Sequence, residues 1–481
     1  MSTILRRLPT EEATGLRTGA RHQLAQVYRP ADLVVLGLGV MIGAGIFTIA
    51  GRQAATTAGP GVIISFMIAG IASMLAALCY AELASTMPTS GSAYTFTYVI
   101  FGEVWAWIIA WALILEMELA AAVVARAWSI YAVQTLADFG ISAPYGDAFT
   151  AVILIVITGT VAMGSRIGLR ALWVMVTAKL VAIGAVIVVG ALHFKAANLG
   201  DFYVPPRPTT TPPDTVIGVV FGEGHAFGWF GVFAAAPAIA FAYIGFDLLA
   251  TASEETIDAP RAVPRSMIRS LVIATVIYIA VAVVMVGMVP YTQISTVAPL
   301  ASAFREVKAD WMVHVIDIGA VLGLTTVILV LIVGQTRVLF SMARDGLLPR
   351  ALAVISRRYH TPSTTTLVIG AIAVLLAEFV PVLTLEPLVV IGTLFAFLFV
   401  AAGVIVLRRR MPELPRGFSV PLSPILPACS LIASLWLMVN LQVITWAYFG
   451  LWMAFGLVIY LAYGKSHSHL AEHNRGGKHR R

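Results

Sequence analysis

The chain has 481 residues, of which 59% are hydrophobic and only 11% are charged, and its formal net charge is +7 at pH 7. Soluble globular domains carry roughly 25% charged residues, so this composition excludes a cytosolic enzyme and a nucleic-acid-binding protein. A transmembrane helix needs about 20 apolar residues, and the chain therefore has room for about a dozen such helices with short connections.

Apolar runs bounded by charged residues, Pro or Gly predict an all-α polytopic membrane protein with twelve transmembrane helices. The predicted spans are 33–57, 61–86, 101–136, 148–164, 171–194, 229–253, 267–290, 312–342, 364–381, 387–407, 423–440 and 446–463. The third and eighth runs exceed one straight crossing, which tilt or an extension past the bilayer would explain. The predicted segments are an N-terminal segment 1–31, spans one to five at 32–194, a loop 195–228, spans six to ten at 229–410, spans eleven and twelve at 411–463, and a tail 464–481.

The distribution of Lys and Arg predicts the orientation of these spans. Of the 31 basic residues, 24 lie in the terminal segments and in the connections on the same side. The other side carries five: Arg52, Lys195, Arg207, Arg305 and Lys308. Basic residues concentrate in cytoplasmic connections, so we predict a multi-pass protein of the cell membrane with both termini cytoplasmic and the loop 195–228 extracellular. We expect no metal site, because the histidines of the tail fit a solvated segment better.

The first span contains four glycines within nine positions, from Gly37 to Gly45. Each costs about 1 kcal/mol relative to Ala in a helix interior. Close packing of small residues against another helix would explain this pattern. The alternative is a discontinuous helix, because irregular backbone is tolerated at membrane depth where it lines a cavity or is buried in protein. The N–H groups at the start of the second half would then favour an anionic ligand.

The sixth span has a matching interruption, which favours the discontinuous helix. Its stretch from Phe241 to Asp247 includes Gly245, and Pro237 lies just before it. Interrupted helices at corresponding places in two halves are typical of transporters built from inverted repeats. Spans one to five and six to ten would be the repeats, and spans eleven and twelve would be additions to them.

Two broken helices offer complementary groups to a zwitterion. The N–H groups of Ala44 and Gly45 are candidate donors to its carboxylate. Carbonyls released by the unwinding are candidate acceptors for its ammonium: Met41, Phe241 and Ile244. An amino acid needs both sets, whereas a neutral solute needs neither. The ring of Phe241 could cover the site as a gate, although core packing is an equally common role.

Ionisable residues inside the membrane suggest functions by default. Lys179 lies in span five, about 13 Å from the cytoplasmic end at 1.5 Å per residue. It could gain and lose a proton during transport, with its ammonium beside the carbonyls of span one. A permanently paired structural lysine is the alternative. Glu116, near the middle of span three, could line the side-chain end of a pocket or pair with a helix; Glu118 has no assigned role.

Six segments of the chain form a recognisable series: Ile42 to Phe47, Leu78 to Leu83, Gly91 to Tyr94, Val124 to Ser129, Phe241 to Asp247 with Glu254 and Glu255, and Gly334 to Arg337 with Ala343 to Pro349. With them the chain resembles the cationic amino acid transporter family of the amino acid–polyamine–organocation superfamily, including its bacterial proton-coupled members. The resemblance covers nearly all twelve spans. Six such blocks in order are a specific signal.

This resemblance implies a leucine-transporter-type fold, with substrate held by the unwound parts of spans one and six and with Lys179 as the proton-coupling residue. The chain departs from the family at Ala44, where Thr or Ser is common, so only the backbone can bind there. Leu331 in span eight favours a small or neutral substrate side chain, and Glu116 favours a cationic one. The candidate substrate-binding residues are Met41, Gly43, Ala44, Gly45, Glu116, Phe241, Ala242, Ile244 and Leu331.

We therefore predict a secondary active transporter that takes up L-amino acids with protons by alternating access. An exchanger or uniporter specific for cationic amino acids is an alternative, and a non-transporting amino-acid sensor is another. No nucleophile–base pair or metal cluster is evident in the spans, so we predict no enzyme activity and no cofactor. The expected partners are an L-amino acid, protons and membrane lipid, without nucleic acid.

Overall fold

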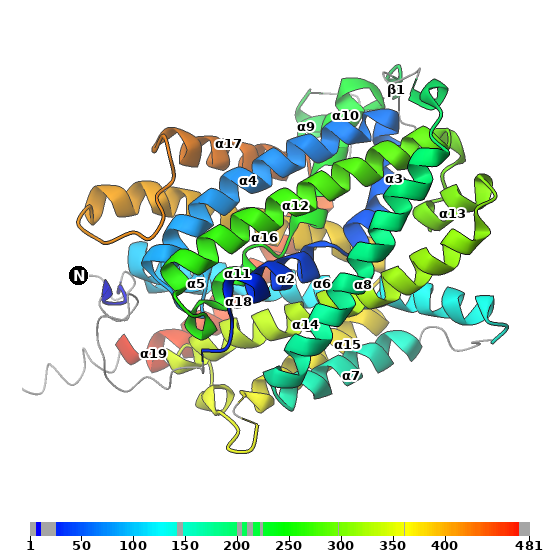
Figure 1. The fold of residues 1–481 in the computed structure, drawn as a ribbon. Helices are drawn as coiled ribbons and strands as arrows, with labels where there is room; N and C mark the ends of the chain where they lie inside the picture. Colours follow the sequence, from blue (N-terminus) through cyan, green and yellow to red (C-terminus); the bar gives the residue numbers. More distant parts are fainter. Residues whose placement is uncertain are drawn as a thin grey trace, which may run out of the picture.

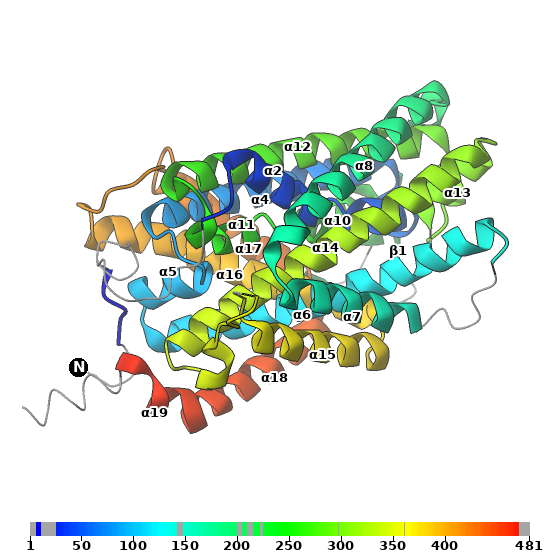
Figure 2. The same ribbon diagram turned by 60° about the horizontal axis from the view of Figure 1, so that its bottom comes forward.

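A computed structural model describes residues 6–10, 26–141, 148–199, 204–208, 215–221, 225–296, 298–359 and 361–470. Eight of the basic and histidine residues used above to predict orientation and the nature of the tail lie outside the described residues: Arg17, Arg21, His473, Arg475, Lys478, His479, Arg480 and Arg481. Within the ranges the chain is almost entirely helical, and most long helices run side by side along the molecule (Figures 1 and 2).

The part of the chain before residue 200 contains the first of the two predicted breaks. Its elements are α2 (Pro30–Met41), the π-helical turn η1 (Gly45–Ile49), α3 (Ala50–Gln53), the π-helical turn η2 (Ala54–Ala58), the 3₁₀ turn η3 (Gly59–Gly61), α4 (Val62–Thr86), α5 (Ala93–Ile100), α6 (Glu103–Asp138), α7 (Ala148–Ala162), α8 (Ser165–Leu192) and the 3₁₀ turn η4 (Ala196–Leu199). The predicted span 33–57 is therefore interrupted after Met41. The third span begins at Glu103 rather than at 101, because Gly102 has φ +108° and separates α6 from α5.

The remaining part begins with a two-stranded antiparallel ribbon that pairs Arg207 with Ala226. Its elements are β1 (Arg207–Pro208), α9 (Val216–Phe221), β2 (His225–Ala226), α10 (Gly228–Tyr243), α11 (Leu248–Thr251), the 3₁₀ turn η5 (Ser253–Glu255), α12 (Ala259–Met288), the 3₁₀ turn η6 (Tyr291–Gln293), α13 (Pro299–Glu306), α14 (Asp310–Arg344), the 3₁₀ turn η7 (Arg350–Ala353), α15 (Ser363–Phe379), α16 (Val382–Arg410), α17 (Ile425–Val439), α18 (Val443–Ile459), the π-helical turn η8 (Tyr460–Gly464) and α19 (Lys465–His467). Helix α12 begins before the predicted 267–290, because its first two turns carry Arg261 and Arg265 and lie outside the apolar run.

The described chain contains eight helical segments that are long and apolar enough to cross a membrane. The first, Pro30–Thr86, has 57 residues and includes the first two predicted spans. Three shorter apolar helices, α7, α15 and α17, accompany them. Helices of this number and composition make the protein a multi-pass membrane protein.

Helices α6 and α14 form the centre of the bundle. Helix α14 packs along α6, α16 packs against the same helix, and α12 packs along α4. The last long helix, α18, is attached to α6 by tryptophans. The rings of Trp111 and Trp452 stack with centroids 4.7 Å apart, and each indole N–H donates to the other residue's carbonyl, at 2.9 and 3.0 Å. Trp107 adds a third such bond to the carbonyl of Gly456, at 2.8 Å.

The described terminal segments meet at one end of the bundle, which we call the terminal end (left in Figures 1 and 2). Glu103, at the start of α6, is fully buried there. Its N–H donates to the carbonyl of Arg6, and its carboxylate accepts from Ser468 at 2.6 Å, Tyr460 at 2.9 Å and Tyr98 at 3.1 Å. Both ends of the described chain therefore lie on the same side of the bundle.

Ion pairs join α14 to the segment after α11 at the terminal end. Arg344 pairs with Glu254 at 3.0 Å, and Arg337 pairs with Glu255 at 2.7 Å. Glu254 also accepts hydrogen bonds from the N–H and the hydroxyl of Ser90, both at 3.0 Å. Although burial raises the pKa of Glu254, the charge of Arg344 and these hydrogen bonds hold it below its usual value. The carboxylate is therefore ionised and links α14 to the segment after α11 at this end.

Candidate functional site

The first break lies between α2 and η1. Helix α2 ends at Met41, Ile42 is extended with ψ 94°, and the chain becomes helical again from Gly45 as a π-helical turn. The first N–H groups of a new helical segment have no acceptor within it. Single π-helical turns within α-helices are frequent at functional sites. The backbone from Gly43 to Gly45 is therefore suited to bind an anionic group.

The second break follows α10. Helix α10 ends at Tyr243, Ile244 is extended, and Gly245 has φ +113°, a conformation that favours glycine. The N–H of Gly245 donates to Oδ1 of Asp247 at 3.2 Å, and the chain becomes helical again at Leu248. Asp247 is buried, and its side chain caps the break locally.

The two breaks pack directly against each other. A Cβ atom on Gly45 would lie 2.3 Å from the Cβ and 2.5 Å from the Cα of Ala242. A Cβ on Gly245 would lie 2.6 Å from the side chain of Val40 in α2. Glycines at these two positions therefore allow the unwound segments to touch, which explains part of the glycine cluster seen in the sequence. Gly43 packs instead on α14, where a Cβ would meet Val327 at 2.6 Å.

A tyrosine that the sequence did not single out joins the two broken helices. The hydroxyl of Tyr278 in α12 lies 2.6 Å from the carbonyl oxygen of Met41 and 2.7 Å from that of Ala242. The carbonyl of Phe241 accepts the N–H of Ile244 at 3.2 Å. The carbonyl of Phe241 thus has a donor, and the one hydroxyl proton of Tyr278 serves either Met41 or Ala242 at a time, so the acceptors expected on the unwound segments are partly occupied. A carbonyl oxygen has a second lone pair, which a ligand ammonium can still use.

Lys179 in α8 lies against the first break and is fully buried. Its ammonium donates to the carbonyls of Gly39 at 2.8 Å and Ile42 at 2.9 Å and to the hydroxyl of Thr326 at 2.9 Å. All three of its N–H donors are therefore used. Thr326 on α14 is a second residue that the sequence did not single out. Because α2 ends at Met41, the carbonyls of Gly39 and Ile42 lack the N–H donors that a continuing helix would supply, and the ammonium of Lys179 takes their place.

Glu116 lies in a second buried polar group, between α6 and α16. Thr393 of α16 forms a side-chain hydrogen bond with it, and Oε2 has no partner among the described residues. Asp247 is close enough for the two carboxyl groups to interact electrostatically, and Tyr80 faces both. Glu118 lies on another face of α6 beside Gln335 of α14.

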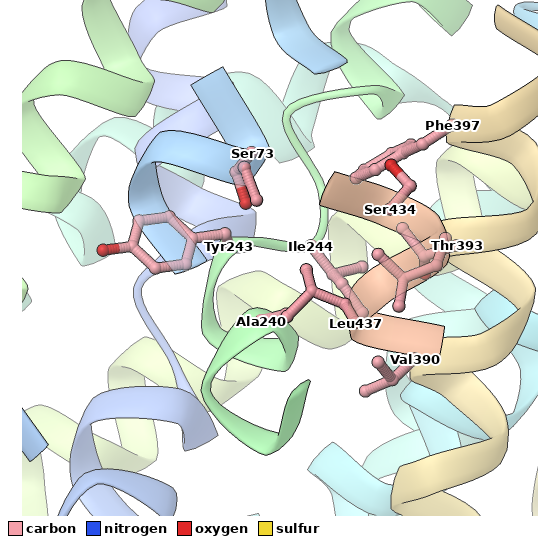
Figure 3. Close-up of a pocket in the computed structure, with 11 residues that line it drawn as sticks. Ser73, Ala240, Tyr243, Ile244, Val390, Thr393, Phe397, Ser434 and Leu437 are labelled. Carbon is pink, nitrogen blue, oxygen red and sulfur yellow. The ribbon is translucent and has the colours of Figure 1, made fainter. Parts of the chain in front are cut away.

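A small cavity lies beside the second break, between α4, α10, α16 and α17 (Figure 3). Its free volume is about 10 Å³, room for about one water molecule. Its walls are mainly apolar, from Ile244, Val390, Leu394, Phe397 and Leu437. Ser73, Thr393 and Ser434 contribute hydroxyl groups. Of the candidate substrate-binding residues, Ile244 lines this cavity, whereas Phe241 and Leu331 are buried elsewhere in the described chain.

Replacing the tyrosine between the breaks tests its structural contribution. Tyr278→Phe should lower stability by about 1–3 kcal/mol, because it removes the hydroxyl donor shared by two buried carbonyls and leaves one of them unsatisfied. The measurement is the thermal unfolding midpoint of the detergent-purified protein. Tyr448→Phe is the matched control, since Tyr448 is 44% exposed on the surface of α18. Equal midpoints for the two variants would show that Tyr278 does not hold the breaks together.

Comparison with known proteins gives consistent results along nearly the whole chain. The family described as Amino acid permease matches residues 31–463. The "Branched-chain amino acid permease BcaP" of Bacillus subtilis (strain 168) is 39% identical over 455 residues, which cover 91% of this chain and 93% of that protein. The "Methylthioribose transporter" of the same organism is 38% identical, over 97% of this chain and 99% of that protein. The "Cationic amino acid transporter 2, vacuolar" of Arabidopsis thaliana is 35% identical, over 85% and 64% respectively.

Proposed function

Since this chain belongs to the amino acid permease family of the amino acid–polyamine–organocation superfamily, we propose that it takes up neutral L-amino acids with protons. The family is one of transporters, which supports transport and no enzyme activity. The proposal specifies the substrate class and the coupling ion. It needs no bound cofactor, because the proton gradient supplies the energy.

The observation that carries the proposal is the ammonium of Lys179 on the carbonyls of the first break. The buried ammonium of Lys179 donates to Gly39, Ile42 and Thr326, which lie on α2, at its break and on α14. Any rearrangement of the broken helix changes these acceptors and therefore the stability of the charged form. Loss of the proton and movement of α2 are then linked, as transport driven by protons requires.

The backbone at the two breaks supports a zwitterionic substrate. The N–H groups of Ala44 and Gly45 begin a helical segment and suit a carboxylate. The carbonyls of Met41, Phe241 and Ile244 lie on the two unwound segments and suit an ammonium. Because Ala44 has no hydroxyl, binding of the carboxylate relies on the backbone.

The residues beside the breaks support an aliphatic substrate side chain. Ile244 and the apolar residues around the small cavity give the second break an apolar surface, which supports an aliphatic substrate side chain in a conformation that widens this cavity. BcaP of Bacillus subtilis, a branched-chain amino acid permease by name, is among the most similar relatives over the whole length. Glu116 and Asp247 favour a cationic side chain instead, as the names of the plant relatives do. Methylthioribose, named for the second relative, has neither carboxylate nor ammonium.

We also propose twelve crossings with both termini cytoplasmic. The segment Pro30–Thr86 counts as two crossings. Each of the other seven long helical segments and each of the three shorter apolar helices counts as one, which gives twelve for the described chain. An even number agrees with terminal segments that meet at Glu103. The breaks after Met41 and Tyr243 support inverted repeats of five helices each.

A ligand panel and a transport assay test the proposal together. Purified protein is first mixed with each of the twenty amino acids and with methylthioribose, and its thermal midpoint is measured, since a ligand stabilises by RT ln(1 + [L]/Kd). Leucine, isoleucine and valine should give the largest shifts. The protein is then reconstituted in liposomes, and uptake of the best ligand should rise when the outside is made acidic.

The alternatives predict different results. Stabilisation by arginine and lysine alone would overturn the neutral substrate class. Stabilisation by methylthioribose alone would overturn the zwitterion site. Uptake that an imposed pH gradient does not change would indicate an exchanger or uniporter, and binding without any uptake would indicate a sensor.

A further inference from the structure

Two carboxyl groups meet at the end of the bundle opposite to the terminal end. Asp138 is the last residue of α6, and Asp317 lies in the third turn of α14. Asp317 is fully buried, and neither of its oxygens has a hydrogen-bond donor among the described residues. The carboxyl group of Asp138 lies within hydrogen-bonding reach of it.

This arrangement requires a proton. An ionised carboxylate only accepts hydrogen bonds, so two ionised groups in contact would leave Asp317 without any partner. Asp317 is buried whereas Asp138 is partly exposed, and a negative charge on each would make the two carboxylates repel each other across this contact. One proton shared by the pair removes both problems, because the protonated carboxyl donates to the other.

Charged and titratable groups surround the pair, some on its solvent side and one on its inner side. His314 of α14 is half exposed, and its Nδ1 lies 3.1 Å from Oδ2 of Asp138. Arg305 of α13 also faces the pair, at a distance over which charges interact. Tyr131 of α6 lies on the inner side, and its hydroxyl donates to the carbonyl of Phe47 at 3.0 Å. The pair therefore lies between solvent and the helical segment after the first break.

We propose that Asp138 and Asp317 form a proton-binding site that ties the ends of α6 and α14 together. A proton from the medium binds between the two carboxyl groups and closes their hydrogen bond. When the proton returns to water, the two carboxylates repel each other and this end of the bundle loosens. The site is separate from Lys179 and does not depend on the proposed substrate or coupling.

The sign of the pH dependence follows from proton counting. In the unfolded chain both aspartates are ionised near neutral pH. The folded protein binds one more proton at this pair, so its stability falls as the pH rises through the release of that proton. For one proton, the unfolding constant rises by up to about tenfold per pH unit. Asp317→Asn keeps a permanent N–H donor to Asp138 and removes this dependence.

The test is the thermal midpoint of the full-length, detergent-purified protein between about pH 5 and about pH 8, a range above the ordinary pKa of an aspartate. The midpoint of the wild type should fall as the pH rises across this range. The midpoint of Asp317→Asn should fall less, and at the highest pH it should exceed that of the wild type. Asp310→Asn, an exposed position on the first turn of α14, should behave as wild type. The midpoint of His314→Gln should still fall with rising pH as in the wild type, which would show that the carboxyl pair and not the histidine causes the pH dependence.

Asp138→Asn, which replaces the other partner, gives a second route if Asp317→Asn does not fold. The midpoint of this variant should also fall less with rising pH than that of the wild type. The proposal is overturned if the folded variants keep the full wild-type dependence, if His314→Gln alone removes it, or if the wild-type midpoint does not fall at all.

Discussion

Lys179→Ala should abolish substrate accumulation driven by a pH gradient. The substitution removes the ammonium that satisfies the carbonyls of Gly39 and Ile42 and the hydroxyl of Thr326. Each hydrogen bond to a charged group contributes about 1.5–3 kcal/mol, so the loss of one alone changes an equilibrium by about tenfold or more. The measurement is the initial rate of uptake into liposomes with the outside acidic. Lys195→Ala, at an exposed lysine after α8, is the control and should transport as wild type.

Lys179→Arg separates a proton carrier from a structural cation. Arginine keeps the positive charge but is not deprotonated in proteins. If the lysine carries the proton, this variant should still bind substrate in the thermal assay while its uptake no longer responds to the pH gradient. If Lys179→Arg accumulates substrate as wild type does, the lysine is a structural cation and the proton binds elsewhere.

Gly45→Ala should prevent the two broken helices from packing. The added Cβ would lie 2.3 Å from one atom of Ala242 and 2.5 Å from its Cα, which belongs to the backbone and cannot rotate away. Overpacking usually costs about 1–3 kcal/mol, and a contact with backbone places this variant at or above the upper end. The yield of folded protein and its thermal midpoint in detergent should both decrease.

Gly159→Ala is the matched control for this experiment. Gly159 lies within α7, and a Cβ there meets nothing within 4 Å. Alanine is favoured over glycine in a helix interior by about 1 kcal/mol, so the control should be neutral or slightly stabilised. If Gly45→Ala unfolds at the same temperature as this control, the breaks are not packed against each other in the folded protein.

Much of this arrangement could be predicted from the sequence because its signals are local. Four glycines within nine positions indicated the first break, and Gly245 after Phe241 indicated the second. The structure assigns different reasons to them: Gly45 and Gly245 allow close approach between breaks, whereas Gly43 packs on α14. Periodicity alone could not distinguish helix packing from unwinding, and both occur here.

The partners of the breaks could not be predicted, because they come from distant parts of the chain. Tyr278 lies 237 positions from Met41, and Thr326 lies 147 positions from Lys179. In the sequence each is an uncharged polar residue inside an apolar run, a pattern that many membrane helices share. The Asp138–Asp317 pair was missed for the same reason, since the two residues become neighbours only when α14 packs along α6.

The burial of Glu103 has a consequence for biosynthesis. Two of its donors, Tyr460 and Ser468, follow it by 357 and 365 residues. Helix α6 is therefore synthesised and inserted long before these donors exist, and its first carboxylate stays in contact with water until the last helix arrives. A chain that stops before Tyr460 keeps only Tyr98 as a side-chain donor among the described residues. In such a truncated chain the carboxylate of Glu103 lacks the two donors that the last helix brings, so the start of α6 is completed only when synthesis of the chain is nearly finished.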